Sequence, residues 1–104
     1  MRKDRDETYL KDISEAIGKI EEYLRRRKYP LFKSRGMFFD AVVREVEIIG
    51  EASTRLSARF REKHNKLPIR TAIGMKNQLI HGYTKIKPWT VWQTCKKDLP
   101  KLKK

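Results

Sequence analysis

Apolar residues recur at intervals of three and four along most of the chain, which is the period of an amphipathic α-helix. The first such stretch predicts a helix from Asp6 to about Lys28, with its apolar side formed by Leu10, Ile13, Ile17, Ile20 and Leu24. Asp6 and Glu7 would lie in its first turn, where acidic side chains complement the helix dipole. Pro30 prevents simple continuation of this helix.

A second, broader apolar stripe predicts a helix from about Met37 to Arg61. It contains Phe38, Ala41, Val42, Val46, Ile49, Ala52, Leu56 and Phe60, widened by Val43 and Ile48. Such a stripe suits either a well-covered central helix or one that also packs on a second protomer. Gly50 costs about 1 kcal/mol relative to alanine inside a helix, which indicates close approach by another helix. Glu47 and Glu51, with no histidines at ligand spacing, are typical of a surface acidic pair and not of a metal site.

A third helix is predicted between Pro68, which suits a first turn, and Gly82, which suits a helix end. Its apolar side gathers Ile69, Ala72, Ile73, Leu79 and Ile80. A second, polar stripe stacks along one face with spacings of four, three and four residues: Arg70, Gly74, Asn77 and His81. Lys76 falls inside the apolar arc, roughly 140° from His81 at ~3.6 residues per turn. A lysine at that position must either extend its charged end to solvent or have a specific role.

Pro88 can open a short fourth helix that contains Trp89 and Trp92. Core packing is the expected role of both tryptophans, and base stacking is the alternative. We expect the lysines that follow to form a frayed basic end that adds non-specific affinity for nucleic acid: Lys96, Lys97, Lys101, Lys103 and Lys104. Because no β-strand pattern competes, the sequence predicts one all-α domain over residues 1–104, an up-and-down bundle of four helices.

Charge narrows the choice of partners. Lys and Arg total 26 against 13 Asp and Glu, which gives a net charge of +13 and a pI near 10.1. A chain of this charge attracts polyanions, of which nucleic acid is the natural first choice. Six positive charges fall between residues 25 and 35: Arg25, Arg26, Arg27, Lys28, Lys33 and Arg35. The run is either a solvated helix end or a patch that contacts phosphates.

Cysteine usage and hydropathy indicate a compartment. Cys95 is the only cysteine, so one chain can build neither a disulfide nor a cysteine zinc cluster, and a reducing cytoplasm is the simpler inference. No apolar run approaches the ~20 residues of a membrane span, and residues 1–4 lead into a charged helix with no secretory h-region. We therefore expect a soluble, cytoplasmic protein with no membrane partner.

His81 is the best candidate for chemistry, because an unperturbed imidazole titrates near pH ~6.5 and can take or give a proton at neutral pH. It lies in polar company, with Asn77 one turn earlier on the same stripe. The other histidine, His64, follows in a polar turn, and we expect it to be exposed and without a catalytic role.

The run from Gly74 to Tyr83 resembles the signature helix of the HEPN superfamily, specifically the HepT-like toxins encoded beside a minimal nucleotidyltransferase antitoxin. Their pattern is an arginine, usually followed by a polar residue, then a histidine after four to six intervening residues, often continued as His-x-Tyr. Asn77, His81 and Tyr83 fit this pattern, whereas Lys76 occupies the arginine position. The resemblance extends to residues 47–52, Pro68, Trp92 and residues 98–100, and so covers nearly the whole chain.

The resemblance implies an endoribonuclease that needs no metal or other cofactor and leaves a 2′,3′-cyclic phosphate. In it, the His81 imidazole would move protons at the ribose 2′-hydroxyl, Asn77 would orient it or the phosphate, and Lys76 would stabilise phosphate charge. Lysine lacks the planar fork of arginine, so reduced activity is expected. If Lys76 is not the phosphate clamp, Arg70 is the next candidate.

The resemblance also implies partners. A homodimer could bring both copies of the motif to one cleft, which the distance of Lys76 from His81 around the helix favours. The cognate nucleotidyltransferase antitoxin would transfer AMP to Tyr83, which would silence the site by bulk and charge. Candidate RNA contacts are Arg25, Arg26 and Arg27 together with Arg70. The alternative is a catalytically weak or inactive HEPN domain that only binds a nucleotidyltransferase partner or nucleic acid.

Overall fold

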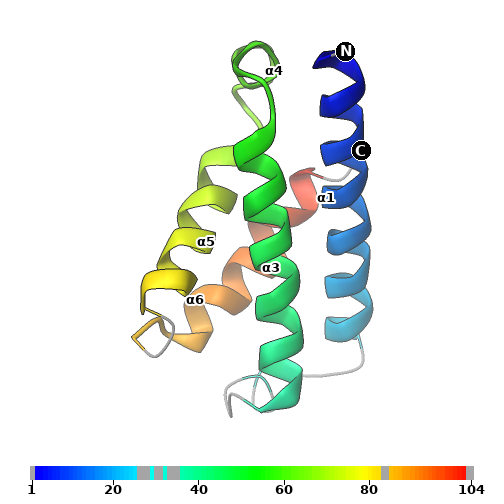
Figure 1. The fold of residues 1–104 in the computed structure, drawn as a ribbon. Coiled ribbons are helices and arrows are strands. Elements are labelled where there is room, and N and C mark those ends of the chain that lie inside the picture. Colours follow the sequence, from blue (N-terminus) through cyan, green and yellow to red (C-terminus); the bar gives the residue numbers. More distant parts are fainter. Residues whose placement is uncertain (1, 26–28, 30–31, 33–35, 83–84, 103–104) are drawn as a thin grey trace.

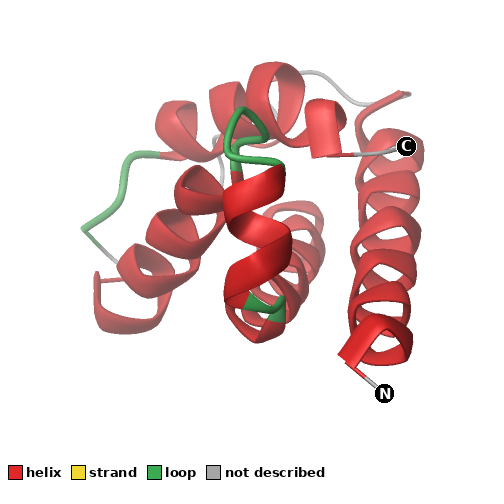
Figure 2. Cartoon of the chain, turned by 90° about the horizontal axis from the view of Figure 1, so that it is seen from above, coloured by secondary structure: helices red, strands yellow, loops and turns green. Residues whose placement is uncertain are grey.

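A computed structural model describes residues 2–25, 29, 32, 36–82 and 85–102. Over these residues every regular element is helical and no strand occurs (Figures 1 and 2). The α-helices are α1 (Arg2–Arg25), α3 (Met37–Arg55), α4 (Ala58–Lys63), α5 (Ile69–Gly82) and α6 (Pro88–Gln93). A π-helical turn (Thr94–Asp98) and a 3₁₀ turn (Leu99–Leu102) follow α6. The predicted all-α class is confirmed.

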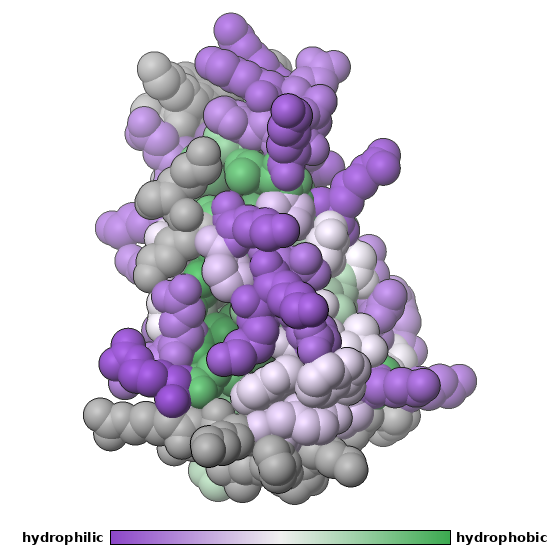
Figure 3. All heavy atoms as spheres, turned by 180° about the vertical axis from the view of Figure 1, so that it is seen from behind, coloured by the Kyte–Doolittle hydropathy of each residue, from purple (hydrophilic) through white to green (hydrophobic). Residues whose placement is uncertain are grey.

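Helix α3 is the centre of the bundle. It runs antiparallel to α1 on one side and to α5 on the other, while α6 and the turns after it cross behind and reach α1 (Figure 1). The core between them is apolar and closed, and its fully buried side chains include Ile13, Ile17, Ile20, Phe39, Val46, Ile49 and Leu79. Seen from behind, hydrophilic side chains occupy much of the upper and outer surface, apolar ones show in patches between them, and pale side chains of intermediate hydropathy gather lower down (Figure 3).

The prediction of one continuous helix to Arg61 is wrong. The backbone leaves the helix at Leu56 (φ −63°, ψ 143°), and Ser57 starts α4 by accepting a hydrogen bond from the Phe60 amide at 3.1 Å. The Asp6 carboxylate fixes this break, because it accepts from the Ser57 amide at 2.9 Å and from the Ser57 hydroxyl at 2.7 Å. The apolar pattern conceals the break, since Leu56 remains buried across it.

Two further boundaries differ from the expectation. Helix α1 begins at Arg2, so Asp6 lies beyond the first turn and its carboxylate serves Ser57 instead of the α1 amides. The chain after α6 is packed and not frayed, because the side chains that alternate with its lysines are buried: Cys95 is 2%, Leu99 1% and Leu102 6% exposed. Lys103 and Lys104 lie outside the described residues.

Candidate functional site on α3 and α5

Helix α5 approaches α3 at Gly50, as its position inside the second apolar stripe predicts. A Cβ atom at Gly50 would overlap the Cβ of Lys76 and lie 2.9 Å from the Ala72 carbonyl oxygen. The expectation of a close helix approach is therefore confirmed, and the residue that fills the space above Gly50 is Lys76. The glycine thus positions the candidate cation of the site directly.

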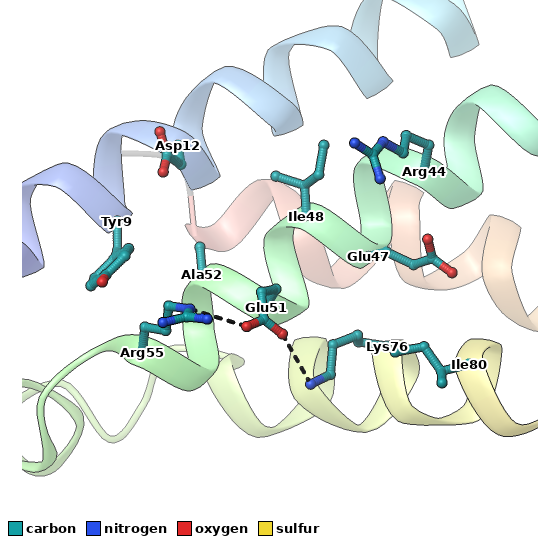
Figure 4. A pocket seen from close by; sticks show the side chains of 10 residues that line it. All are labelled: Tyr9, Asp12, Arg44, Glu47, Ile48, Glu51, Ala52, Arg55, Lys76 and Ile80. Carbon is teal, nitrogen blue, oxygen red and sulfur yellow. Dashed lines mark hydrogen bonds and ion pairs between the residues drawn. The ribbon is translucent and has the colours of Figure 1, made fainter.

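The Lys76 side chain is anchored by its stem and paired at its end. Only 13% of the side chain is exposed, and its ammonium nitrogen lies 3.6 Å from Oε1 of Glu51 (Figure 4). The second oxygen of Glu51 accepts a hydrogen bond from Nε of Arg55 at 3.0 Å. Glu51, which is exposed at the surface as expected, is therefore shared between two cations, a role that the sequence did not predict.

A cavity of about 340 Å³ opens beside this ion pair, on the face of α3 that is turned away from the core. Its walls come from three helices, α1, α3 and α5, and include Tyr9, Arg44, Ile48, Glu51, Lys76 and Ile80 (Figure 4). The pKa of the Arg55 guanidinium, which also lines it, is raised by its hydrogen bond to Glu51, by the charge of Glu51 and by a hydrogen bond with Tyr9. The cavity thus holds charges of both signs, among which Glu51 is paired with both Lys76 and Arg55.

The polar stripe of α5 lies where the helical wheel puts it. Arg70, Asn77 and His81 are all exposed, and His81 occupies the last turn of α5. His81 does not line the cavity that contains Lys76. Within one chain the structure therefore brings Lys76 together with Glu51 on the α3 side of α5 and leaves His81 and Asn77 facing solvent.

The remaining candidates fall in different places. Arg25 is exposed and forms an ion pair with Glu22 at 3.1 Å, which contributes little in so open a setting. The expectation that His64 is exposed is wrong, because it is half-buried and its ring lies 4.4 Å from that of Phe60. Arg26, Arg27 and Tyr83 lie outside the described residues.

Sequence reasoning missed the partners of Lys76. A lysine inside an apolar arc, such as Lys76, needs a counter-ion. Because Gly50 makes room for the aliphatic part of the Lys76 side chain, the residue after it on α3, Glu51, lies at the edge of the same helix contact. That signal was present in the sequence, whereas Tyr9 and Arg55 enter only through the packing of α1 on α3.

Two properties of the described residues bear on the binding of metal ions and on membranes. No group of three or more His, Cys, Asp or Glu side chains there is arranged to hold a metal ion. None of the helices formed by those residues is both long and apolar enough to cross a membrane.

Fold and site together define a small, strongly basic helical bundle whose α5 exposes an imidazole and an amide one turn apart. Comparison with known families agrees: the model of the family "Ribonuclease HepT-like" matches residues 13–104. The chain belongs to this family, within the HEPN superfamily.

Several relatives of the chain are named as ribonucleases. The chain is 40% identical over 95 residues to "Probable ribonuclease HepT" of Thermococcus cleftensis, covering 91% of this chain and 86% of the relative. It is 38% identical over 96 residues to a "Putative RNase" of Methanocaldococcus jannaschii, covering 92% of this chain and 88% of the relative.

A further M. jannaschii protein, "Gamma-glutamylcyclotransferase and putative RNase", is 42% identical over 103 residues. These residues make up 99% of this chain but only 46% of that relative, so the chain spans about half its length. No solved structure matches the chain significantly.

Proposed function

We propose that this chain is a metal-independent endoribonuclease and the toxin of a pair whose antitoxin is a minimal nucleotidyltransferase. The observation that carries the proposal is the solvent-facing surface of α5, on which His81 and Asn77 stand one turn apart in a chain of the HepT-like family. An exposed imidazole beside an amide, on a chain of net charge +13, suits proton transfer on a polyanionic substrate.

The proposed reaction is an internal transesterification. The ribose 2′-oxygen loses its proton to a base and forms a bond to phosphorus, while the bond from phosphorus to the 5′-oxygen breaks and that oxygen receives a proton from an acid. The products are a 2′,3′-cyclic phosphate and a 5′-hydroxyl. A neutral imidazole can act as the base and an imidazolium as the acid, so His81 suits either step. Asn77 would orient the imidazole or donate to a phosphate oxygen.

Lys76 would supply the cation that stabilises phosphate charge, but only if a phosphate can reach its ammonium group. Its ammonium lies 3.6 Å from the Glu51 carboxylate, so a phosphate must replace or share that partner. A lysine also grips phosphate as a point charge, without the paired hydrogen bonds of arginine. The weaker grip of lysine favours the second candidate function, a weakly active or inactive domain that binds RNA or a nucleotidyltransferase. We expect Lys76→Arg to raise cleavage if Lys76 is the phosphate clamp, and to leave it unchanged if Arg70 takes that role.

A homodimer is part of the proposal, because Lys76 and His81 lie on different sides of α5. Two features of the cavity support an apolar contact there: the Ile80 side chain is exposed, at 58%, and Ile48 is only partly buried. A two-fold arrangement of two such faces would place the α5 helices of both protomers close together. One protomer would then supply the imidazole that acts as base and the other the imidazolium that acts as acid.

The decisive experiment uses the two histidines as a matched pair. Purified wild-type protein is compared with His81→Ala and His64→Ala in cleavage of labelled single-stranded RNA, with helix content checked by circular dichroism. His81→Ala should abolish cleavage and His64→Ala should retain it, because His64 caps the end of α4 and packs against Phe60. Equal cleavage by folded His81→Ala protein would contradict the assignment. Absence of cleavage by the wild type would favour the binding domain.

The antitoxin half of the proposal has its own test. Co-expression with a cognate minimal nucleotidyltransferase should add one or more AMP units to Tyr83, found by intact-mass spectrometry and peptide mapping. Tyr83→Phe should escape modification and stay toxic. A neutralised complex in which Tyr83 is unmodified would leave inhibition by binding alone.

Replacing Arg25, Arg26 and Arg27 together by uncharged residues should weaken RNA binding at low salt without changing the proton-transfer step.

A further inference from the structure

The two tryptophans of α6 have different environments. Trp92 is buried, at 9% exposure, and packs on Phe32 with ring centroids 5.3 Å apart. Trp89, three residues earlier, is 49% exposed and is among the large apolar side chains most open to solvent. Its indole meets the ring of Tyr29 edge-on, at 4.9 Å between centroids and 85° between planes. Tyr29 also contacts Trp92 at 5.6 Å, so the exposed indole is held by a ring that is itself packed on the core.

The charged residues near Trp89 in the sequence have one sign. The sequence from Gly82 to Lys97 contains four lysines and neither aspartate nor glutamate. Lys85 and Lys87, which precede Trp89 at alternate positions, are both exposed, and Lys87 is the residue that caps α6. Two exposed cations that closely precede a partly open aromatic ring in the chain form a combination with which proteins bind single strands, since the ring stacks on a base and the cations attract phosphates.

Trp89 also lies at the His81 end of the bundle. The Lys85 and Ile86 amides donate to the Gly82 carbonyl oxygen at 2.9 and 3.0 Å, so the chain folds back directly at the end of α5. Ile86 is buried and anchors this turn. The end of α5 (yellow) and the start of α6 (orange) accordingly lie together in Figure 1. A strand whose phosphate is held near His81 therefore has an aromatic surface within reach along the same end.

We propose that Trp89, with Lys85 and Lys87, forms a subsite that stacks one unpaired base of a single-stranded RNA next to the His81 region. This inference rests on the proposed function and deepens it, because it names the substrate class: RNA with at least one unstacked base beside the cleaved bond. A duplex hides the faces of its bases and offers this subsite only phosphates.

The test uses a strand that binds but cannot react, a fluorescein-labelled 2′-O-methyl oligoadenylate, in which the nucleophilic hydroxyl is blocked. Fluorescence anisotropy gives the affinity of wild-type, Trp89→Ala and Trp89→Phe proteins at several salt concentrations. Met37→Ala is the matched control, since Met37 is 89% exposed and also loses an apolar side chain. Trp89→Ala should bind about tenfold more weakly or worse, with an unchanged salt slope, because stacking is lost and phosphate contacts are kept. Trp89→Phe should retain most of the affinity, and Met37→Ala all of it.

Two further measurements separate the subsite from its alternatives. Lys85→Gln with Lys87→Gln should flatten the salt slope, whereas Trp89→Ala should leave binding to the same strand in a duplex unchanged. The proposal is overturned if Trp89→Ala binds the single strand as wild type does, or if its effect is instead a change of oligomeric state in sedimentation. Cleavage of ordinary RNA is scored separately: loss of cleavage in His81→Ala with unchanged binding in Trp89→Ala removes the subsite and keeps the ribonuclease. Binding that depends on Trp89, in a protein that cleaves no RNA, would keep the subsite and remove the ribonuclease.

Discussion

Replacing Gly50 by alanine tests whether the α3–α5 contact is as close as the structure shows. Alanine in a helix interior is normally favoured over glycine by about 1 kcal/mol. Here the new methyl group would overlap the Cβ of Lys76 and lie 2.9 Å from the Ala72 carbonyl oxygen. Both obstacles belong to the α5 backbone or are fixed to it, so a rotamer change cannot remove them and the helices must separate. Overpacking of this kind costs about 1–3 kcal/mol, and the upper end applies when backbone must move.

The net expectation for Gly50→Ala is a loss of about 2 kcal/mol, or a fall in Tm of about 10 °C for a domain of this size. Gly74→Ala is the matched control, because Gly74 is also helical and a Cβ there would meet nothing within 4 Å. It should gain up to about 1 kcal/mol. Urea unfolding followed by circular dichroism, at one protein concentration for all variants, measures the difference. If Gly50→Ala proves as stable as Gly74→Ala, the close approach and the placement of Lys76 derived from it are both wrong.

Two other predictions concern charge and burial. Glu51→Gln frees the Lys76 ammonium, so single-stranded RNA should bind several-fold more tightly at low salt, and its affinity should fall more steeply with salt. Glu15→Gln is the control, because it makes the same charge change at an exposed site on α1. An equal effect of Glu15→Gln on RNA binding would contradict a specific role for Glu51. Burial raises the pKa of the Cys95 thiol to about 12, so iodoacetamide at pH 8 should alkylate it slowly in the folded protein and readily in urea, as mass spectrometry can show. Because the unfolded thiol ionises first, near pH ~8.5, the same shift should lower folding stability as pH rises from there toward 12, and Cys95→Ala should remove that part of the loss.

Helical periodicity was sufficient for the elements whose apolar faces meet the core. The spacing of three and four residues predicted α1, α3 and α5, and Pro88 correctly marked the start of α6. Gly50 predicted the close helix approach because a glycine inside a helix is costly unless space demands it. The position of Lys76 inside the apolar arc also followed from the wheel, and its low exposure agrees.

What the pattern could not give depends on contacts between distant residues. The break after α3 is held by Asp6 and Ser57, which are 51 positions apart, while the apolar stripe runs through it without interruption. Apolar spacing also did not predict the packing of the chain after α6, because the apolar residues there, such as Leu99 and Leu102, are few and lie among lysines. The spacing of hydrophobic residues predicts which side of a helix is buried. It carries no information about a hydrogen bond that ends one helix and starts the next.

Gly50 and Glu51 act on the same residue of α5 in different ways. Consecutive helix positions point about 100° apart, so Gly50 faces α5 and receives the Lys76 stem, while Glu51 stands at the rim and receives the ammonium. The Glu51 side chain is 51% exposed and the two charges are 3.6 Å apart, a pairing that solvent weakens to the range of 0–1 kcal/mol. A phosphate that enters the cavity can therefore take over the ammonium at little cost, whereas the stem stays fixed by the helix contact. If Lys76 is the phosphate clamp that we propose, the fold would hold this cation in place for a phosphate, with Glu51 as a partner that can be exchanged.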